Sequence, residues 1–114
     1  MKNIFLIDGG KLYKVNLATG EYQSIAGDWS STRLLTSCKG SLYAIDKSSL
    51  YKVNPENGGY SKLEGDWSGA VMLEGVDEHL VVMDGSALYK VDPDTGSYSK
   101  LTTGWSGSPC STVL

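Results

Sequence analysis

The stretch Leu12-Tyr13-Lys14-Val15-Asn16 decides the fold, because it returns as Leu50-Tyr51-Lys52-Val53-Asn54 and again as Leu88-Tyr89-Lys90-Val91-Asp92. Each return comes 38 residues after the one before. A fixed period of this length is the signature of a protein built from stacked structural repeats. Three such periods account for all 114 residues. We therefore predict a single repeat domain at residues 1–114, with units at residues 1–38, 39–76 and 77–114.

Several other residues keep the same 38-residue offset. They are Asp8, Asp46 and Asp84; Gly20, Gly58 and Gly96; Tyr22, Tyr60 and Tyr98; and the pairs Trp29-Ser30, Trp67-Ser68 and Trp105-Ser106. Because residue 114 completes one period and residue 1 starts another, the two ends of the chain are in phase. This internal symmetry is typical of a pattern that closes on itself.

Within each unit, short apolar runs are separated by Gly, Asn, Asp, Ser and Pro, and no stripe of period 3.6 is present. Such a pattern indicates strands and tight turns and argues against helix. The second unit reads as strands at residues 41–46, 50–54, 60–64 and 70–76. The sequence therefore predicts an all-β fold of three tandem units, each with four short antiparallel strands.

Four short strands cannot bury both faces of their sheet, so the units must pack on one another around an axis. A β-trefoil or a β-prism closes with three units in one chain, whereas a β-propeller needs roughly four to eight blades. The simple meander of nearly equal strands favours the propeller. We predict three blades per chain that complete a six-bladed propeller as a homodimer, with a strand at residues 109–114 beside the partner's strand at residues 3–8. The alternative is a single-chain β-trefoil or β-prism.

The unit resembles propeller blades of the tachylectin and tectonin lectin type. The residues that carry this resemblance are Gly65-Asp66-Trp67, Leu42-Tyr43-Ala44-Ile45 and Leu50-Tyr51-Lys52. The stretch at residues 88–96 also looks like repeats of pyrroloquinoline-quinone-type propellers, including non-catalytic scaffold members. The first resemblance implies lectin-like, multivalent carbohydrate binding, and the second supports the fold alone.

The repeated tryptophans Trp29, Trp67 and Trp105 are the main candidates for ligand binding. An exposed indole face at the loop entering each inner strand can stack on a sugar ring or a cation. The competing interpretation is that these rings dock one unit onto the next. The polar neighbours that would hydrogen-bond a sugar are Asp28, Asp66, Ser30, Ser68 and Ser106. The third unit has Thr103-Gly104 where an aspartate is expected, so we predict a weak or absent site there.

Arg33 is the only arginine. We expect it in an inner strand, where it would line a central channel and bind an anion or acidic ligand. His79 is the only histidine, and Cys38 and Cys110 occupy different phases of the repeat. These residues form neither a recognisable catalytic triad nor a zinc-binding pattern. We therefore predict no catalytic residue, no metal and no cofactor, and hence a protein that is not an enzyme.

Charge and hydropathy limit the classes of binding partner that we expect. The 13 acidic and 10 basic residues give a net charge of -3, which argues against nucleic-acid binding. The apolar run at residues 4–7 is too short for a signal peptide or a membrane span, so we expect a cytoplasmic protein without membrane contact. The favoured partners are a second copy of the chain and a carbohydrate ligand, and the alternative function is a protein–protein interaction scaffold.

Overall fold

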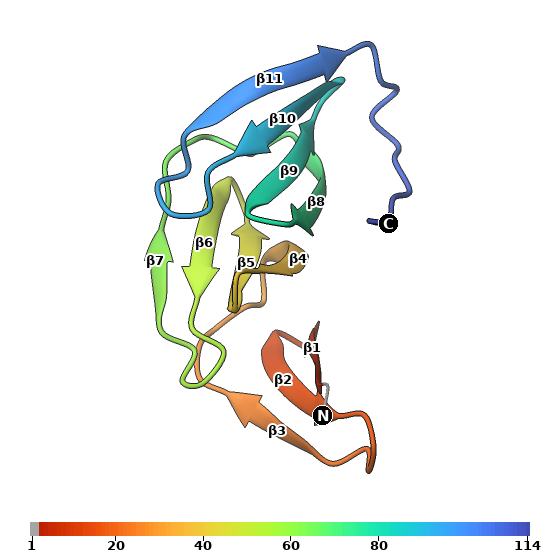
Figure 1. Cartoon of the computed structure of the whole chain (residues 1–114). Coiled ribbons are helices and arrows are strands. Elements are labelled where there is room, and N and C mark those ends of the chain that lie inside the picture. Colours follow the sequence, from red (N-terminus) through yellow and green to blue (C-terminus); the bar gives the residue numbers. More distant parts are fainter. Residues whose placement is uncertain (1–2) are drawn as a thin grey trace.

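The computed structural model describes residues 3–114 as three antiparallel sheets, and these residues contain no helix (Figure 1). Sheet 1 is formed by β1 (Asn3–Asp8), β2 (Lys11–Asn16) and β3 (Tyr22–Ile25). Sheet 2 is formed by β4 (Thr32–Cys38), β5 (Ser41–Asp46), β6 (Ser49–Val53) and β7 (Tyr60–Lys62). Sheet 3 is formed by β8 (Ala70–Val76), β9 (His79–Asp84), β10 (Ala87–Val91) and β11 (Tyr98–Thr103). The predicted all-β fold with repeated sheets is confirmed.

The turn residues explain why each unit is a meander. Lys39 and Gly40 join β4 to β5 with φ of 51° and 80°, the paired positive values of a tight hairpin turn that matches strand twist. In the longer turns, Asn16, Asn54 and Asp92 each accept the backbone N–H two residues later, at 2.8, 2.7 and 2.7 Å. These side-chain bonds hold the same turn shape in all three units.

The grouping of strands into sheets differs from the predicted units by one strand. The sequence pattern places residues 70–76 last in the second unit, but β8 pairs with β9 and is the first strand of sheet 3. The reason is the two-residue turn at Asp77, where φ is 53°, which folds β9 directly back onto β8. Residues 104–114 contain no strand, including the predicted one at 109–114. Residues 1–2 of the first predicted unit lie outside the described residues.

Sheet 2 lies between sheets 1 and 3, as Figure 1 shows. Because successive strand residues point to opposite faces, β5 packs toward both neighbours. Leu42 and Ala44 join a buried cluster with sheet 1, whereas Tyr43 and Ile45 join a second cluster with sheet 3. The core is therefore divided into two layers, one at each junction between sheets.

The first strands of sheets 2 and 3 approach closely at Gly75. A Cβ atom at this position would collide with the Ser37 carbonyl oxygen, and the Gly75 N–H donates to Thr36 Oγ1 at 3.1 Å. The absent side chain at position 75 is what lets β4 and β8 come together.

Candidate functional site

Trp29 is buried at the junction of sheets 1 and 2, with 4% of its surface exposed. Its ring meets Tyr51 and Tyr60 edge to face, with centroids 6.4 and 5.5 Å away, and the two tyrosine rings meet each other at 5.4 Å. Edge-to-face pairs at these distances are favourable beyond the apolar area that they bury. The indole therefore packs one sheet on the next, and the exposed ring of the trio is Tyr60, at 62%.

The junction of sheets 2 and 3 repeats this trio. Trp67 is 2% exposed and lies 5.6 Å from Tyr89 and 5.1 Å from Tyr98, again edge to face. Tyr98 is the exposed member, at 55%. Trp29 and Trp67 both lie where one sheet packs on the next, as the docking interpretation expects. The aromatic surface that solvent can reach belongs to Tyr60 and Tyr98.

The Gly-Asp-Trp sequence has a local structural reason. A Cβ at Gly27 would lie 2.5 Å from Trp29 Nε1, and one at Gly65 would lie 2.7 Å from Trp67 Nε1. Both glycines also have positive φ, at 121° and 108°. The glycine thus provides the space that the indole N–H occupies, and within residues 3–114 neither indole N–H has a hydrogen-bond acceptor.

The aspartates beside the tryptophans shape the loop. Asp28 Oδ1 accepts the Ser30 N–H at 3.1 Å, and Asp66 Oδ1 accepts the Ser68 N–H at 3.0 Å. Hydrogen bonds from Ser30 lower the pKa of Asp28, which therefore stays ionised at neutral pH. Both serines are exposed. The predicted polar neighbours are thus brought together in pairs, with their carboxylates at the mouth of each junction.

A small cavity opens at the first junction, and we call it the junction notch. It has a volume of about 90 Å³ and is lined by Asp28, Trp29, Asp46, Tyr51 and Tyr60. Asp46 Oδ2 accepts the Thr32 hydroxyl at 2.9 Å, which fixes the second carboxylate. Asp46, Tyr51 and Tyr60 were not among the site residues predicted from the sequence, although their 38-residue repetition was the available signal.

The second junction places the equivalent carboxylates, Asp66 and Asp84, near one another. Burial, and then the charge of Asp66, raise the pKa of Asp84 above its usual value. The Gly69 N–H bond to Asp84 opposes that shift. Because the ionised form of Asp84 is disfavoured beside Asp66, a hydrogen-bond donor placed between the two carboxylates would be favourable.

The third tryptophan has the same backbone position but a different environment. The backbone N–H of Trp105 donates to the Ser86 carbonyl at 3.0 Å, as that of Trp29 does to Gly10 at 3.0 Å and that of Trp67 does to Ser48 at 2.8 Å. The Trp105 side chain is nevertheless 48% exposed. Ser106 beside it is also exposed. Trp105 occupies a repeat position whose partner sheet is missing from residues 3–114.

Arg33 lies in β4 and has backbone carbonyl oxygens as partners, and anion binding at this residue stays a prediction. It is the extra residue of a β-bulge in β4, where the register shifts between Thr32 and Leu34. Its guanidinium donates to the carbonyl oxygens of Lys47 at 2.9 and 3.3 Å, Trp67 at 3.0 Å and Ala70 at 2.6 Å. These bonds tie sheet 2 to the loop that enters sheet 3.

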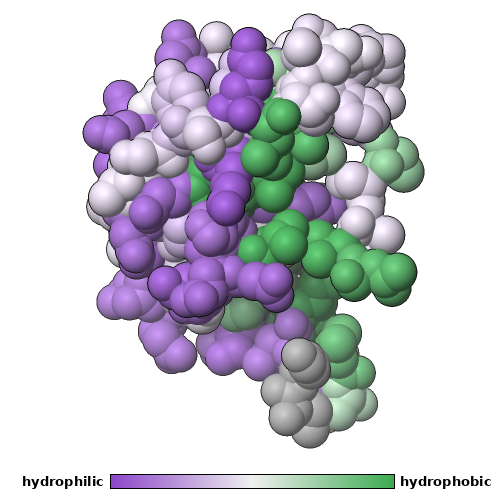
Figure 2. Space-filling model, turned by 45° about the horizontal axis from the view of Figure 1, so that its top comes forward, coloured by the Kyte–Doolittle hydropathy of each residue, from purple (hydrophilic) through white to green (hydrophobic). Residues whose placement is uncertain are grey.

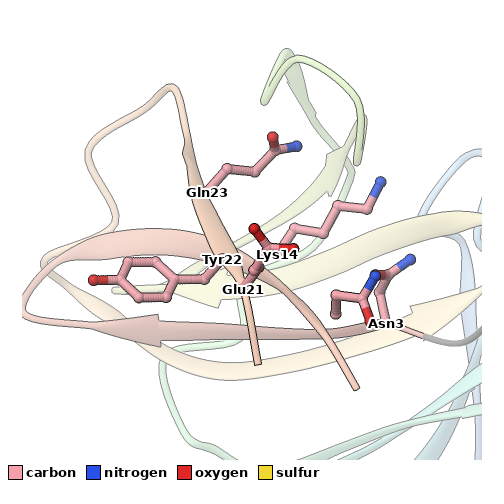
Figure 3. A pocket seen from close by; sticks show the side chains of 6 residues that line it. Asn3, Lys14, Glu21, Tyr22 and Gln23 are labelled. Atoms are coloured by element: carbon pink, nitrogen blue, oxygen red, sulfur yellow. The ribbon is translucent and has the colours of Figure 1, made fainter. Parts of the chain in front are cut away.

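An open polar hollow of about 460 Å³ lies on sheet 1. It is lined by Asn3, Lys14, Asn16, Glu21, Tyr22 and Gln23. Figure 3 shows that the Tyr22 ring points away from Asn3 and Lys14, so these side chains do not converge on one point. A similar hollow of about 600 Å³ on sheet 2 includes Lys52 and Asn54, the same repeat positions as Lys14 and Asn16.

Metal sites and membrane spans are two further classes of feature. Within residues 3–114, His, Cys, Asp and Glu side chains form no group of three or more suited to hold a metal ion. The same residues include no helix with the length and apolar character needed to cross a membrane.

No protein-family model matches the chain, and no curated protein is similar to it in sequence. Solved structures are similar in fold. One is PorZ, an essential bacterial surface component of the type-IX secretion system of Porphyromonas gingivalis, with a TM-score of 0.70 and 12% identity over 92% of this chain. Another is the extracellular domain of the putative one component system BT4673 from B. thetaiotaomicron, with a TM-score of 0.61 and 19% identity over 89%. The N-terminal domain of Nup159 has a TM-score of 0.65 and 14% identity over 89%.

The chain spans only part of each of these proteins: 16% of PorZ, 15% of the BT4673 domain and 31% of the Nup159 domain. At such low identity, the similarity shows a shared arrangement of repeated antiparallel sheets and nothing about activity.

Proposed function

We propose that this chain is a non-enzymatic binding protein whose three sheets are blades of a β-propeller and whose ligand is a carbohydrate. The junction notch carries the proposal. It combines the carboxylate acceptors Asp28 and Asp46 with the aromatic rings of Tyr51 and Tyr60. Sugars present hydroxyl donors beside apolar C–H faces, and this pairing of acceptors and aromatic rings suits them.

The size of the notch sets what part of a sugar enters it. A volume of about 90 Å³ corresponds to about three water molecules, enough for a hydroxymethyl group or one edge of a sugar ring. Because Trp29 is only 4% exposed, stacking on the rest of the ring falls to Tyr60, which is 62% exposed. The proposed contact is therefore with tyrosine at the rim, and the tryptophan supports it from below.

Repetition of the site adds avidity. The second junction has Asp66, Asp84 and Tyr98 at the repeat positions of Asp28, Asp46 and Tyr60. Several weak sites on one rigid body bind a multivalent glycan much more tightly than one site does. We propose that two chains form one six-bladed ring, which doubles the number of sites.

A glycan array followed by titration with simple amino sugars tests the ligand class. Asp46→Asn and Tyr60→Ala should each reduce sugar binding at least tenfold, because each removes a direct contact of about 1.4 kcal/mol or more. Asp8→Asn is the matched control: Asp8 has the repeat position of Asp46, but the loop that would face it carries Gly104 where Asp28 stands, so the carboxylate pair is incomplete there. Silence of the wild-type protein on the array would refute carbohydrate binding. Capture of one specific protein, insensitive to sugars, would instead support the interaction scaffold.

A further inference from the structure

The two junctions between sheets use the same repeat positions. From the lower-numbered sheet, the first junction takes Leu12, Ile25 and Trp29, and the second takes Leu50, Leu63 and Trp67. From the higher-numbered sheet, the first takes Leu42, Ala44 and Val53, and the second takes Leu80, Val82 and Val91. One packing rule, repeated every 38 residues, therefore describes both interfaces.

Each outer sheet presents one unused half of this interface. On sheet 3, Leu101 and Trp105 stand at the positions of Leu63 and Trp67 and are 53% and 48% exposed. On sheet 1, Ile4, Leu6 and Val15 stand at the positions of Leu42, Ala44 and Val53, and the first two are 47% and 36% exposed. Figure 2 shows apolar side chains gathered toward one side of the molecule, while the opposite side is mostly hydrophilic. By the repeat, the two free faces are the complementary halves of the interface that both existing junctions use.

The aromatic trio gives independent support for this match. Trp29 and Trp67 each pack against a tyrosine pair on the next sheet. Sheet 1 holds such a pair, Tyr13 and Tyr22, in the same edge-to-face arrangement at 5.7 Å and 81°. Among residues 3–114, no tryptophan packs on this tyrosine pair, and Trp105 packs on no tyrosine pair.

A cavity marks where the partner's side chains would enter. It has a volume of about 330 Å³ and lies between sheet 3 and residues 105–111. Met72, Met83, Leu88 and Trp105 give it an apolar wall. By the repeat, the side chains that fill this place at the second junction correspond to Ile4, Leu6 and Val15 of the next copy.

The edge of sheet 1 lacks the strand that its neighbours have. In residues 3–114, β1 is paired with β2 alone. The corresponding strands β5 and β9 each have a second partner, because β5 also pairs with β4 and β9 also pairs with β8. Residues 108–114 stand at the repeat positions of β4 and β8. They are held to their own chain by a bond from the Ser111 hydroxyl to Glu74, at 2.8 Å and exposed.

The register of the missing pairing can be worked out from the two that exist. Leu34 pairs with Ile45, and Met72 pairs with Met83, so Cys110 would pair with Ile7 of the partner. Residue 109 stands at the repeat position of residues 33 and 71, where a bulge interrupts the two existing strand pairings. Proline is compatible with a bulge, where a ladder N–H is not required. Pro109 therefore does not prevent the strand.

We infer that two copies interlock head to tail, each adding residues 108–114 as the inner strand beside β1 of the other. This inference rests on the proposed six-bladed ring and specifies how it closes. Each copy then also buries the free face of sheet 3 against the free face of sheet 1 of its partner. Because three blades make half of the proposed six-bladed ring, the head-to-tail rotation closes at two copies and does not extend into a fibre.

Ile7→Cys tests the register directly, since antiparallel partners on one face have Cβ atoms about 5 Å apart. Oxidation by aerobic copper–phenanthroline should join Cys110 of one copy to the new thiol of the other and give a covalent dimer that a reducing agent separates. Leu6→Cys is the matched control, because a shift of one residue turns the side chain to the opposite face. Equal dimer yield from both variants, or none from Ile7→Cys, would overturn the interlock.

Light scattering distinguishes failure of the interlock from failure of the six-bladed ring. The wild type should have twice the chain mass of 12.2 kDa. Ile4→Lys should give single chains, whereas Leu17→Lys, at a 61% exposed turn residue, should not. A wild type of single mass at high concentration overturns both the ring and the interlock. A double mass without the disulfide from Ile7→Cys overturns the interlock alone, and neither result bears on sugar binding.

Discussion

The Tyr43 hydroxyl provides a pH-dependent test of the packing between sheets 2 and 3. Tyr43 is 1% exposed, and its hydroxyl donates to the Pro93 carbonyl oxygen at 2.9 Å. Burial raises the pKa of Tyr43 to about 12, from a usual value of 10.0. The stability that this shift represents is fully present below pH 10 and is lost as the pH rises toward 12, because the unfolded chain ionises first. Its full size is about 2.7 kcal/mol, and about half of that is lost by pH 11.

The assay compares the wild type with Tyr43→Phe in urea unfolding followed by tryptophan fluorescence. At pH 9 the variant should be less stable by about 1–3 kcal/mol, because the Pro93 carbonyl is left without a donor. At pH 11 this gap should shrink by about 1.4 kcal/mol. Tyr22→Phe serves as the control for loss of an exposed hydroxyl, since Tyr22 is 71% exposed. A Tyr43→Phe gap that is the same at both pH values would refute the reasoning.

Three further changes test other contacts. Gly75→Ala should lower the free energy of unfolding by about 1–3 kcal/mol, because the new methyl group meets the Ser37 carbonyl and β4 must move from β8; an unchanged urea midpoint would contradict this. Arg33→Met should cost about 1 kcal/mol through lost bonds to three carbonyl oxygens, and millimolar phosphate should not raise the wild-type Tm, whereas an anion site would give such a rise. Burial raises the pKa of Cys38, so in a Cys110→Ser variant, which removes the exposed thiol, Cys38 should react with a disulfide reagent only on unfolding, and rapid labelling of that native variant would count against its buried position.

The strands were largely predictable because the repeat reports the same turn chemistry three times. Residues 3–8, 41–46 and 70–76 were expected as strands and are found with those bounds. The assignment of 70–76 to a sheet was wrong, because apolar alternation shows where a strand lies but not which neighbour it pairs with. Residues 109–114 share the strand phase yet form no strand in a single chain, since a strand needs an edge to pair with.

The candidate site was predictable in its residue types and less so in their roles. Repetition selected Asp28 and Trp29, but it could not tell an indole that stacks on a ligand from one that packs on a sheet. That distinction depends on Tyr51 and Tyr60, which come from the following sheet and cover the ring. The position of Arg33 in a strand was predicted, but its hydrogen-bond partners were not, because its acceptors lie in loops of two different sheets.

Trp105 shows that burial in this protein is decided by the neighbouring sheet and not by the unit that carries the tryptophan. It shares its Trp-Ser pair and its backbone hydrogen bond with Trp29 and Trp67, yet it is 48% exposed where they are 4% and 2% exposed. The difference is the absence, within residues 3–114, of a fourth sheet carrying a tyrosine pair. If the proposed ring closes, Trp105 is covered by Tyr13 and Tyr22 of the partner and the aromatic surface left for a ligand is tyrosine alone. Carbohydrate binding by an exposed tryptophan and closure by a second copy therefore require the same Trp105 side chain. A shift of the Trp105 fluorescence emission to shorter wavelength on dimerisation would show that the indole becomes buried, and would assign Trp105 to closure.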